Sequence, residues 1–367
     1  MTASTETVAR NATDSVNEHY DVIVIGGGSA GLSGAKIMAR SRRSVLVIDA
    51  GAPRNSPAEG VHNYLYAEGT APSRLTEIGR AEASRYGVDI VEGTATGATA
   101  RENPEPGTSR FTVEVTTGAG RTHTVGARRL LMATGLIDVL PDIPGMRERW
   151  GIDVLHCPFC HGWEVRDQAI GVVGTSPMAL HQVILFRQLS ADIKYFQHTA
   201  PDPTDEQREQ LAALGIEHIC GEVAEVVTAG GALSGLRMAD GRVLARQVIA
   251  IGTTANGRED LVADLGLSMT DLKMGEIVAG RYVAADPSGL TTTPGVWAAG
   301  NVADPRAQVI NSAASGASAG ATIHMDLMTE DTAIAVSALR QKKASHGHEE
   351  WLQEQFKKVG DGKTEMR

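Results

Sequence analysis

The sequence predicts an α/β fold with two successive dinucleotide-binding units, and three observations support this prediction. Short, continuous apolar runs recur along the chain, as is typical of buried parallel strands, and stretches of helical character separate them. Glycine is abundant, at 41 of 367 residues, which suits many tight strand-to-helix turns. Two of the apolar runs each lead into a glycine-containing turn, a helix and a second strand. The length allows two domains, each with its own core.

The first unit is complete from its first strand to a closing acid. Asp21–Ile25 has the pattern of a buried strand, and the turn Gly26–Gly31 follows it directly. Leu32–Arg43 has the pattern of a helix, Ser44–Ile48 that of the next strand, and Asp49 closes this strand. A lone G-x-G-x-x-G is weak evidence, but here it stands in the full context that a dinucleotide site requires.

The glycines and the acid of this unit have separate expected roles. Gly26 allows the tight turn, Gly28 lets the backbone approach a pyrophosphate, and Gly31 lets the helix pack closely on the strand. The helix N-terminus attracts the phosphate charge. Asp49 can accept hydrogen bonds from a ribose hydroxyl.

The chain between the two units begins with an irregular segment. Ala50–Thr70 contains several prolines and glycines and is long for a connection, so we expect it to act near the ligand. A helix over Ser73–Tyr86 follows, and Arg129–Gly135 is a buried strand that ends in a glycine turn. Pro141–Pro144 marks a domain boundary. The other strands predicted here are Asp89–Val91, Phe111–Val115 and Thr122–Val125.

The second unit combines a strand at Ala169–Val173, a helix at Met178–Leu189 and a strand at Ile193–Phe196. The elements predicted after it are a helix at Thr204–Leu214, strands near Ile216–Ile219, Glu222–Val227, Leu233–Met238 and Val248–Ile251, a hairpin turn at Ala239–Arg242, the returning segments Tyr282–Ala284 and Gly295–Val302, and a long helix at Gln308–Met328. In the charged tail, Glu349–Val359 carries apolar residues on one helical side, which fits either docking on a partner subunit or a frayed terminal helix.

The stretch His156–Glu164 carries two of the three cysteines, Cys157 and Cys160, in a C-x-x-C pattern. Such a pair can close and reopen a small disulfide, and nearby cationic or hydrogen-bonding groups favour its thiolate form. We expect a direct role for His161, whereas His156 also fits a residue that only ends a strand. Trp163 fits packing better than chemistry.

Two other kinds of site can use the same cysteines. C-x-x-C-H is also the attachment motif for c-type haem, but that chemistry requires export, and Met1–His19 is polar and does not resemble a secretory signal. A zinc site needs four ligands, usually from two separated pairs, and Cys220 is too isolated to supply the second pair. We expect Cys220 to be a buried structural residue and predict no metal site.

Composition narrows the class of protein. A net charge of −10 argues against a nucleic-acid-binding surface, which needs a basic face. The sequence has no run of about 18 apolar residues, so we expect no membrane-spanning helix. Three cysteines do not make a disulfide framework, so the pattern indicates a cytoplasmic redox protein.

The two units, the C-x-x-C pair and the returning segment Ala298–Val302 together resemble the low-molecular-weight thioredoxin reductases, in the class-II pyridine nucleotide-disulfide oxidoreductase family. The resemblance spans Tyr20–Leu327 and implies two Rossmann-like domains of the three-layer ββα type. It implies a discontinuous FAD-binding domain at 20–139 and 255–330 and a degenerate NADPH-type domain with the C-x-x-C pair at 140–254. From their own composition, we expect 1–19 to be a disordered lead-in and 331–367 a charged tail.

The resemblance also assigns the residues that would bind FAD. Asn301 stands where the family usually has Asp, but an amide can still hydrogen-bond the ribityl hydroxyls. The implied FAD residues are Gly26, Gly28, Ser29, Ala30, Gly31, Asp49, Ala50, Gly51, Arg54, Asn55, His62, Ala133, Thr134, Gly135, Gly300, Asn301, Gln308 and Val309. For His62, a role in stabilising its loop is an equal alternative.

Three departures from the reductases point to a narrower group. Ser176 replaces a glycine of the NADPH fingerprint, and Phe196–Ala200 lacks the arginines that would bind a 2′-phosphate. His161 replaces the Asp that usually follows the second cysteine. With Ala50–Asn55 followed by His62, these features resemble the thioredoxin-reductase-like dithiol oxidases, which close disulfides in natural products such as gliotoxin, holomycin and romidepsin.

This second resemblance implies FAD-dependent oxidation of a small-molecule dithiol to an intramolecular disulfide, by way of a disulfide between Cys157 and Cys160. His161 would be the base, molecular oxygen the electron acceptor, and the protein a homodimer. Two alternatives remain open. One is a disulfide reductase that uses NADPH or another donor, and the other is a non-catalytic flavin-binding redox sensor or partner-binding subunit.

Overall fold

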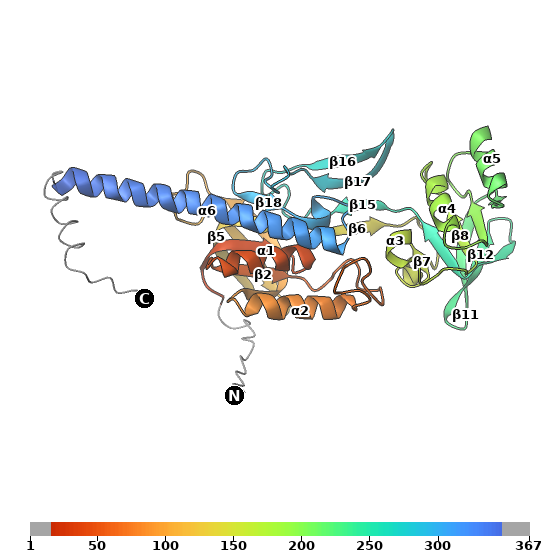
Figure 1. Ribbon diagram of the computed structural model, residues 1–367, viewed down its shortest axis with the longest axis horizontal. Helices are drawn as coiled ribbons and strands as arrows, with labels where there is room; N and C mark the ends of the chain where they lie inside the picture. The colour runs from red at the N-terminus through yellow and green to blue at the C-terminus, as the bar shows by residue number, and fades with distance from the viewer. Residues whose placement is uncertain (1–15, 347–367) are drawn as a thin grey trace, which may run out of the picture.

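The computed structural model describes residues 16–346 as two lobes joined by two strands, β6 (Leu136–Val139) and β15 (Thr254–Gly257) (Figure 1). The predicted docking segment at 349–359 and most of the lead-in at 1–19 lie outside these residues. Within the described residues, no helix is both long and apolar enough to cross a membrane. The α/β fold class that the sequence predicts is confirmed.

The first lobe is built on a six-stranded sheet with the order β1-β2-β3-β4-β5-β18, in which β1 also pairs with β5. Only β4 runs antiparallel to its neighbours. The strands are β1 (His19–Ile25), β2 (Val45–Asp49), β3 (Asp89–Ala100), β4 (Phe111–Thr117), β5 (Thr122–Met132) and β18 (Val296–Ala298). The strand pieces expected at 122–125 and 129–135 are thus one continuous strand up to Met132.

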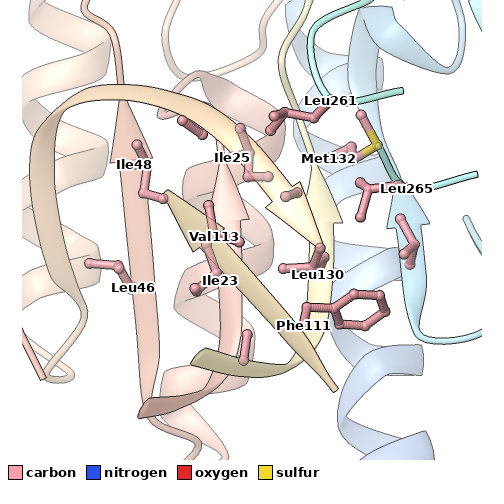
Figure 2. Close-up of a cluster of buried hydrophobic side chains, with 14 of the residues drawn as sticks. Ile23, Ile25, Leu46, Ile48, Phe111, Val113, Leu130, Met132, Leu261 and Leu265 are labelled. Carbon is pink, nitrogen blue, oxygen red and sulfur yellow. The ribbon is translucent and has the colours of Figure 1, made fainter. Parts of the chain in front are cut away.

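Both faces of this sheet are covered. Successive side chains of a strand point to opposite faces, so its continuous apolar runs bury residues on both. On one face Ile23, Leu46 and Leu130 pack with Leu261 and Leu265 from the segment after β15 (Figure 2). The other face packs against three helices, α1 (Ser29–Arg40), α2 (Pro72–Ser84) and α6 (Val309–His346). This arrangement gives the three layers expected of a dinucleotide-binding domain.

The second lobe contains a five-stranded parallel sheet, β10-β9-β8-β14-β7, with an antiparallel three-stranded sheet, β11-β12-β13, beside it. Its strands are β7 (Val154–Leu155), β8 (Ile170–Val173), β9 (Ile193–Phe196), β10 (Glu217–Ile219), β11 (Val223–Ala229), β12 (Ala232–Met238), β13 (Val243–Ala245) and β14 (Val248–Ile251). Its helices are α3 (Pro158–His161), α4 (Ala179–Arg187) and α5 (Asp205–Ala213), with a 3-10 turn, η1 (Arg147–Arg149).

A small four-stranded sheet with the order β16-β17-β15-β6 carries the chain out to the second lobe and back. It contains β16 (Met269–Met274) and β17 (Ile277–Val283), and a 3-10 turn, η2 (Gly300–Val302), follows β18. The sequence indicated only the end of β17 in this region. The strands are short and partly exposed, so their side chains lack the continuous apolar run that marks a buried strand.

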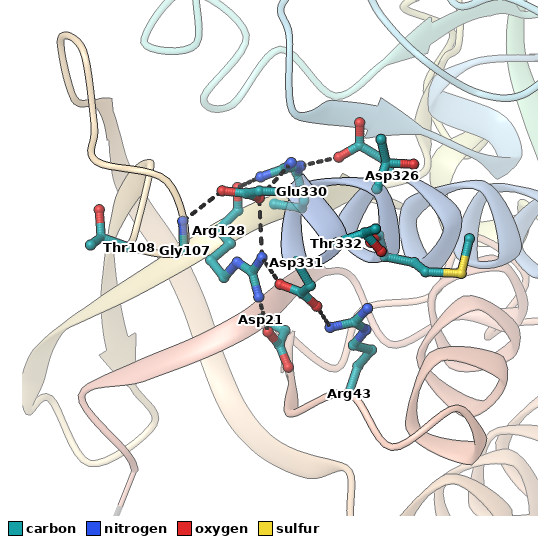
Figure 3. Close-up of polar contacts among 12 residues, drawn as sticks. Asp21, Arg43, Gly107, Thr108, Arg128, Asp326, Glu330, Asp331 and Thr332 are labelled. Carbon is teal, nitrogen blue, oxygen red and sulfur yellow. Dashed lines mark hydrogen bonds and ion pairs between the residues drawn. The ribbon is translucent and has the colours of Figure 1, made fainter. Parts of the chain in front are cut away.

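Helix α6 is longer than the sequence predicts, at 38 residues, and continues through the start of the charged tail. An ion-pair cluster holds it to the first lobe (Figure 3). The Arg129 guanidinium lies 2.9 Å from the Glu330 carboxylate, and Arg43 lies 2.6 Å from Asp331. Arg128 also contacts Asp331, at 2.5 Å. These ion pairs anchor α6 just beyond its predicted end at Met328.

Small residues let α6 cross α1 closely. A Cβ atom added to Gly316 would lie only 1.9 Å from the backbone oxygen of Ala30, and one added to Gly320 would lie 2.7 Å from that of Gly34. Any side chain at these positions would push the helices apart. The crossing therefore fixes the N-terminal half of α6 against the helix that follows the first glycine turn.

Candidate active site

A cavity of about 1570 Å³ extends from the first glycine turn to the cysteine pair and is lined by both lobes. The sequence-predicted residues that line it are Gly26, Gly28, Ser29, Ala30, Asp49, Ala50, Gly51, Arg54, Asn55, His62, Ala133, Thr134, Gly135, Cys157, Cys160, His161, Gly300, Asn301, Gln308 and Val309. Gly31 lies behind the lining, where its packing role was expected.

The first glycine turn leaves space for an anion at the start of α1. Gly26 has φ +110°, and an added Cβ would lie 2.2 Å from the backbone oxygen of Ala133. An added Cβ at Gly31 would lie 1.9 Å from the backbone oxygen of Gly26. At Gly28, by contrast, no atom of the described residues lies within 4 Å of that position. The free N–H groups of the first turn of α1 thus face no steric obstacle to a phosphate.

Asp49, the acid that closes the first unit, is bound by Arg80, a residue that the sequence did not indicate. Arg80, from α2, donates to Asp49 at 2.6 Å and to Glu92 at 2.8 Å. Burial alone would lower the pKa of Arg80, but these two carboxylates outweigh it and raise the pKa. The backbone N–H of Gly51 also donates to Asp49, at 3.2 Å. The Asp49 carboxylate is therefore fixed in position beside the cavity.

Two further predicted residues differ in how they present polar atoms. The Thr134 hydroxyl is buried and has no hydrogen-bond partner among residues 16–346, so a ligand group could satisfy it. The Asn301 amide nitrogen donates to the backbone oxygens of Ala307, at 2.8 Å, and Asp304, at 3.1 Å. Asn301 thus shapes the loop that leads to α6, and its amide oxygen is the atom that can face a hydroxyl.

The cysteine pair lies at the start of the short helix α3. Cys157 and Cys160 form a disulfide with their Cα atoms 5.3 Å apart. Pro158 occupies the first helical position, where its fixed φ suits the helix and its missing N–H removes no hydrogen bond within the helix. His156 precedes the pair, and its Nδ1 lies 3.0 Å from the backbone oxygen of Ile251, consistent with the strand-end role. Burial lowers the pKa of His156.

His161 ends α3 and is neutral at neutral pH. Burial is the main cause that lowers the pKa of its imidazole; Glu164 partly offsets this, and His62 adds to it. Its Nε2 is buried and has no hydrogen-bond partner within the described part of the chain. A neutral imidazole beside the disulfide can accept a proton from a thiol.

The irregular loop after β2, which we expected to act near the ligand, reaches across to the second lobe. The Asn63 side chain donates to the backbone oxygen of Phe159 at 2.6 Å, between the two cysteines. His62 Nδ1 lies 2.6 Å from a Glu68 oxygen, and its Nε2 lies 3.5 Å from Glu164. The loop therefore places an imidazole and an amide next to the disulfide helix.

Arg54 of the same loop binds the strand that joins the lobes. Its guanidinium makes two contacts to the Asp138 carboxylate, at 2.6 and 2.8 Å. Asp138 is almost fully buried and also accepts from the Thr253 hydroxyl at 2.8 Å. Neither Asp138 nor Glu68 could be paired from the sequence, because no motif specifies their partners.

The glycine turn of the second unit differs from that of the first. Three residues separate β1 from α1, whereas five separate β8, which ends at Val173, from α4, which starts at Ala179. The Ser176 hydroxyl accepts the backbone N–H of Met178 at 3.3 Å, and Pro177 has no N–H to offer an anion. After β9, Gln197 donates to Asp202 at 2.6 Å, so an acid stands near this strand end.

Cys220 is exposed, and the expectation that it is buried was wrong. Strand β10 ends at Ile219, and Gly221, with φ +98°, turns the chain, so residue 220 lies beyond the buried strand. Trp163 is also largely exposed, and the Arg166 guanidinium lies 4.1 Å from its ring centroid. Across residues 16–346, no three His, Cys, Asp or Glu side chains are placed to hold a metal ion.

Comparison with known proteins agrees with this geometry. The family model for pyridine nucleotide-disulphide oxidoreductases matches residues 20–320. A probable thioredoxin reductase of Arthroderma benhamiae is 34% identical over about half of each chain, 50% of this one and 46% of that one. Thioredoxin reductase tcpT of Claviceps purpurea is 29% identical over 86% of this chain and 97% of its own. The crystal structure of HlmI is 40% identical, covers 90% of this chain and 99% of its own, and has a TM-score of 0.78.

Proposed function

The chain belongs to the pyridine nucleotide-disulphide oxidoreductase family, and on that premise we propose that it is a dithiol oxidase. It is an FAD-binding oxidoreductase that acts on sulfur groups. In the proposed reaction a small-molecule dithiol, of the kind found in sulfur-containing natural products, becomes an intramolecular disulfide. Molecular oxygen is the final electron acceptor and becomes hydrogen peroxide. The homodimer and the cytoplasmic location implied by the resemblance stay predictions.

The observation that carries the proposal is the contrast between the two glycine turns. Space is open at Gly28, whereas the equivalent position of the second unit carries the Ser176 side chain, followed by Pro177. The pyrophosphate of a nicotinamide cofactor needs close approach to the backbone and free N–H donors at this point. The contrast supports electron flow from a thiol substrate to the flavin rather than from NADPH to a disulfide.

The residues of the first lobe fit FAD. The open space at Gly28 suits a pyrophosphate, the fixed Asp49 carboxylate suits a ribose hydroxyl, and the buried Thr134 hydroxyl lacks a partner that a ligand could supply. When bound, FAD would take an electron pair from the cysteines and pass it to oxygen.

The cysteines and His161 carry the thiol chemistry. His161, neutral because of its burial, accepts the proton of the first substrate thiol. The thiolate attacks Cys157; a substrate–Cys157 bond forms, the Cys157–Cys160 bond breaks, and Cys160 leaves as a thiolate. The second substrate thiol then attacks the substrate sulfur of this mixed disulfide and releases Cys157. The second step is fast because it is intramolecular.

An anaerobic titration of the purified yellow protein tests the proposal. We expect NADPH to leave the flavin colour unchanged and dithiothreitol to bleach it, with air restoring the colour and producing hydrogen peroxide. Cys160→Ser should abolish bleaching by dithiothreitol while the variant keeps its FAD. Rapid bleaching by NADPH alone would overturn the oxidase proposal.

A second candidate is a disulfide reductase, because the matched relatives from Arthroderma benhamiae and Claviceps purpurea carry the name thioredoxin reductase. The same titration separates the two. A reductase should be bleached by NADPH or another donor and reoxidised by thioredoxin disulfide, whereas an oxidase should be reoxidised by air at a rate that supports turnover.

A further inference from the structure

We propose that His62, held by Glu68, is the second base of the site and takes the proton of the substrate thiol that resolves the mixed disulfide. The inference rests on the proposed function, which requires two thiols to lose their protons in each cycle. His161 can account for one of them. When the second thiol reacts, His161 still holds the first proton, so the second deprotonation needs another base.

The contacts of His62 are those of a base with a fixed orientation. A Glu68 oxygen lies 2.6 Å from Nδ1, so the proton of the neutral ring sits on Nδ1 and the lone pair on Nε2. The His62 hydrogen bond lowers the pKa of Glu68, which keeps this carboxylate ionised. Glu68 is fixed in turn by the backbone N–H of Asn63, at 2.9 Å.

The second ring nitrogen of His62, Nε2, lies on the side of the segment that carries the disulfide. Nε2 lies 3.5 Å from Glu164, three residues after His161. Asn63, the next residue, binds the backbone oxygen of Phe159 between the cysteines at 2.6 Å. His62, Cys157 and Cys160 line the same cavity.

Each ring nitrogen of His62 has a carboxylate beside it. Once Nε2 has gained a proton, the ring carries a positive charge between the Glu68 and Glu164 carboxylates, one at each nitrogen. Glu68 is 64% exposed, so the proton has a short route to water. The charged and titratable groups that face His62 are Glu68, Glu164 and His161.

The order of the two protons follows from where the bases stand. His161 is on α3 beside the disulfide that the first thiol attacks, whereas His62 comes from the loop of the other lobe. In the second step His62 takes the thiol proton, a disulfide forms within the substrate, the substrate–Cys157 bond breaks, and Cys157 leaves as a thiolate. Over both steps the substrate loses two electrons and two protons, and the enzyme disulfide gains the two electrons.

The test is a rapid acid quench of the holoenzyme after anaerobic mixing with dithiothreitol, followed by mass spectrometry and flavin absorbance. His62→Gln should form the adduct of one dithiothreitol on Cys157 at the wild-type rate and then resolve it about 100-fold more slowly, the scale of general-base effects. Glu68→Gln should slow resolution about 10-fold, and Glu68→Asp should restore part of the rate. The deficit of His62→Gln should shrink as the pH rises through about 8.5, where thiols ionise unaided.

Glu59→Gln is the matched control, since Glu59 is an exposed carboxylate of the same loop that does not line the cavity. It should behave as wild type. A purely structural role of His62 would lower FAD content or slow both steps together, without accumulation of the adduct, and that result would overturn the inference. So would resolution at the wild-type rate in His62→Gln. If dithiothreitol fails to reduce even the wild-type flavin, the proposed function fails and the inference falls with it.

Discussion

The Asn63 side chain of the first lobe donates a hydrogen bond to the backbone oxygen of Phe159 in the second lobe, at 2.6 Å. The acceptor lies between the two cysteines of the disulfide. Asn63 has φ +60°, a left-handed conformation that Asn tolerates better than most residues. This one contact therefore ties a left-handed residue within the loop after β2 to the short helix that carries the redox pair.

Replacing Asn63 should separate the hydrogen bond from the backbone strain. Asn63→Gly keeps the left-handed φ and should cost about 1 kcal/mol of unfolding free energy for the lost bond. Asn63→Ala should cost about 1 kcal/mol more, because alanine is strained at this φ. Urea unfolding of both variants measures the two costs. Equal stability of Asn63→Gly and wild type would show that the bond contributes nothing.

Alanine at Gly28 should mainly reduce flavin binding, whereas alanine at Gly31 should mainly destabilise the fold. Gly28→Ala meets no atom of the described residues within 4 Å, so the apoprotein should lose less than about 1 kcal/mol, the usual range for an N-cap change, while FAD content falls sharply. Gly31→Ala places a Cβ 1.9 Å from the backbone oxygen of Gly26 and should destabilise the apoprotein by more than about 2 kcal/mol. Urea unfolding and flavin absorbance measure both. Full FAD content in Gly28→Ala would contradict the assigned phosphate site.

The contact between Arg54 and Asp138 should be sensitive to the shape of the cation. Arg54→Met leaves the carboxylate of Asp138, only 5% exposed, with the Thr253 hydroxyl alone, and should cost roughly 2–3 kcal/mol, less than for a fully buried pair because Arg54 is 30% exposed. Arg54→Lys should recover only part, since lysine cannot make both contacts. The double variant Arg54→Met with Asp138→Leu should be more stable in urea than Arg54→Met alone. If it is less stable, the cost does not come from an unpaired carboxylate.

Mild acid should loosen the second lobe first. Burial lowers the pKa of four histidines there, His156, His161, His198 and His218, below the ordinary value of 6.5. Below about pH 6.5 the unfolded chain binds protons that the folded lobe does not, so stability is full above that pH and falls as the pH drops toward the folded pKa values. Hydrogen exchange measured at about pH 7.5 and 5.5 should show β8, β9 and β14 losing more protection than β1 and β2. Equal loss in both lobes would contradict this origin.

In the first lobe the carboxylates that clamp α6 titrate at lower pH. Burial would raise the pKa values of Glu330 and Asp331, but hydrogen bonds and the arginines outweigh it, so both lie below their ordinary values of 4.5 and 3.8. Their contribution is present above these values and is lost only in stronger acid. The two lobes should therefore respond to acid in separate pH ranges.

The sequence predicted the parts of the protein that depend on local pattern. The Gly26–Gly31 turn, its flanking strands and the cysteine pair stand where continuous apolar runs and fixed spacings indicated them. The fold class, the family and FAD as cofactor are confirmed. The assignments of individual site residues stay predictions, although nearly all of those residues line one cavity.

What the sequence could not predict are pairings between distant charges. Asp138 pairs with Arg54 across 84 positions, and Arg80 of helix α2 reaches Asp49 at the end of strand β2. Arg80 and Asp138 have the pattern of ordinary surface charges, because ion pairs have no fixed spacing except within a helix. The predicted end of α6 at Met328 was too early for the same reason. The ion pairs just beyond it join Glu330 and Asp331 to arginines that are distant in the sequence.

The order of the elements along the chain has a consequence for synthesis on the ribosome. The last strand of the first-lobe sheet, β18, and the helix that crosses α1 at Gly316 both come after the whole second lobe. The second lobe, in contrast, draws its strands from one continuous segment that ends at Ile251. A nascent chain can complete the second lobe early, but the first lobe is complete only when residues beyond 316 have emerged. The disulfide-bearing lobe can thus be complete while the lobe that binds the electron acceptor still lacks its last strand and helix.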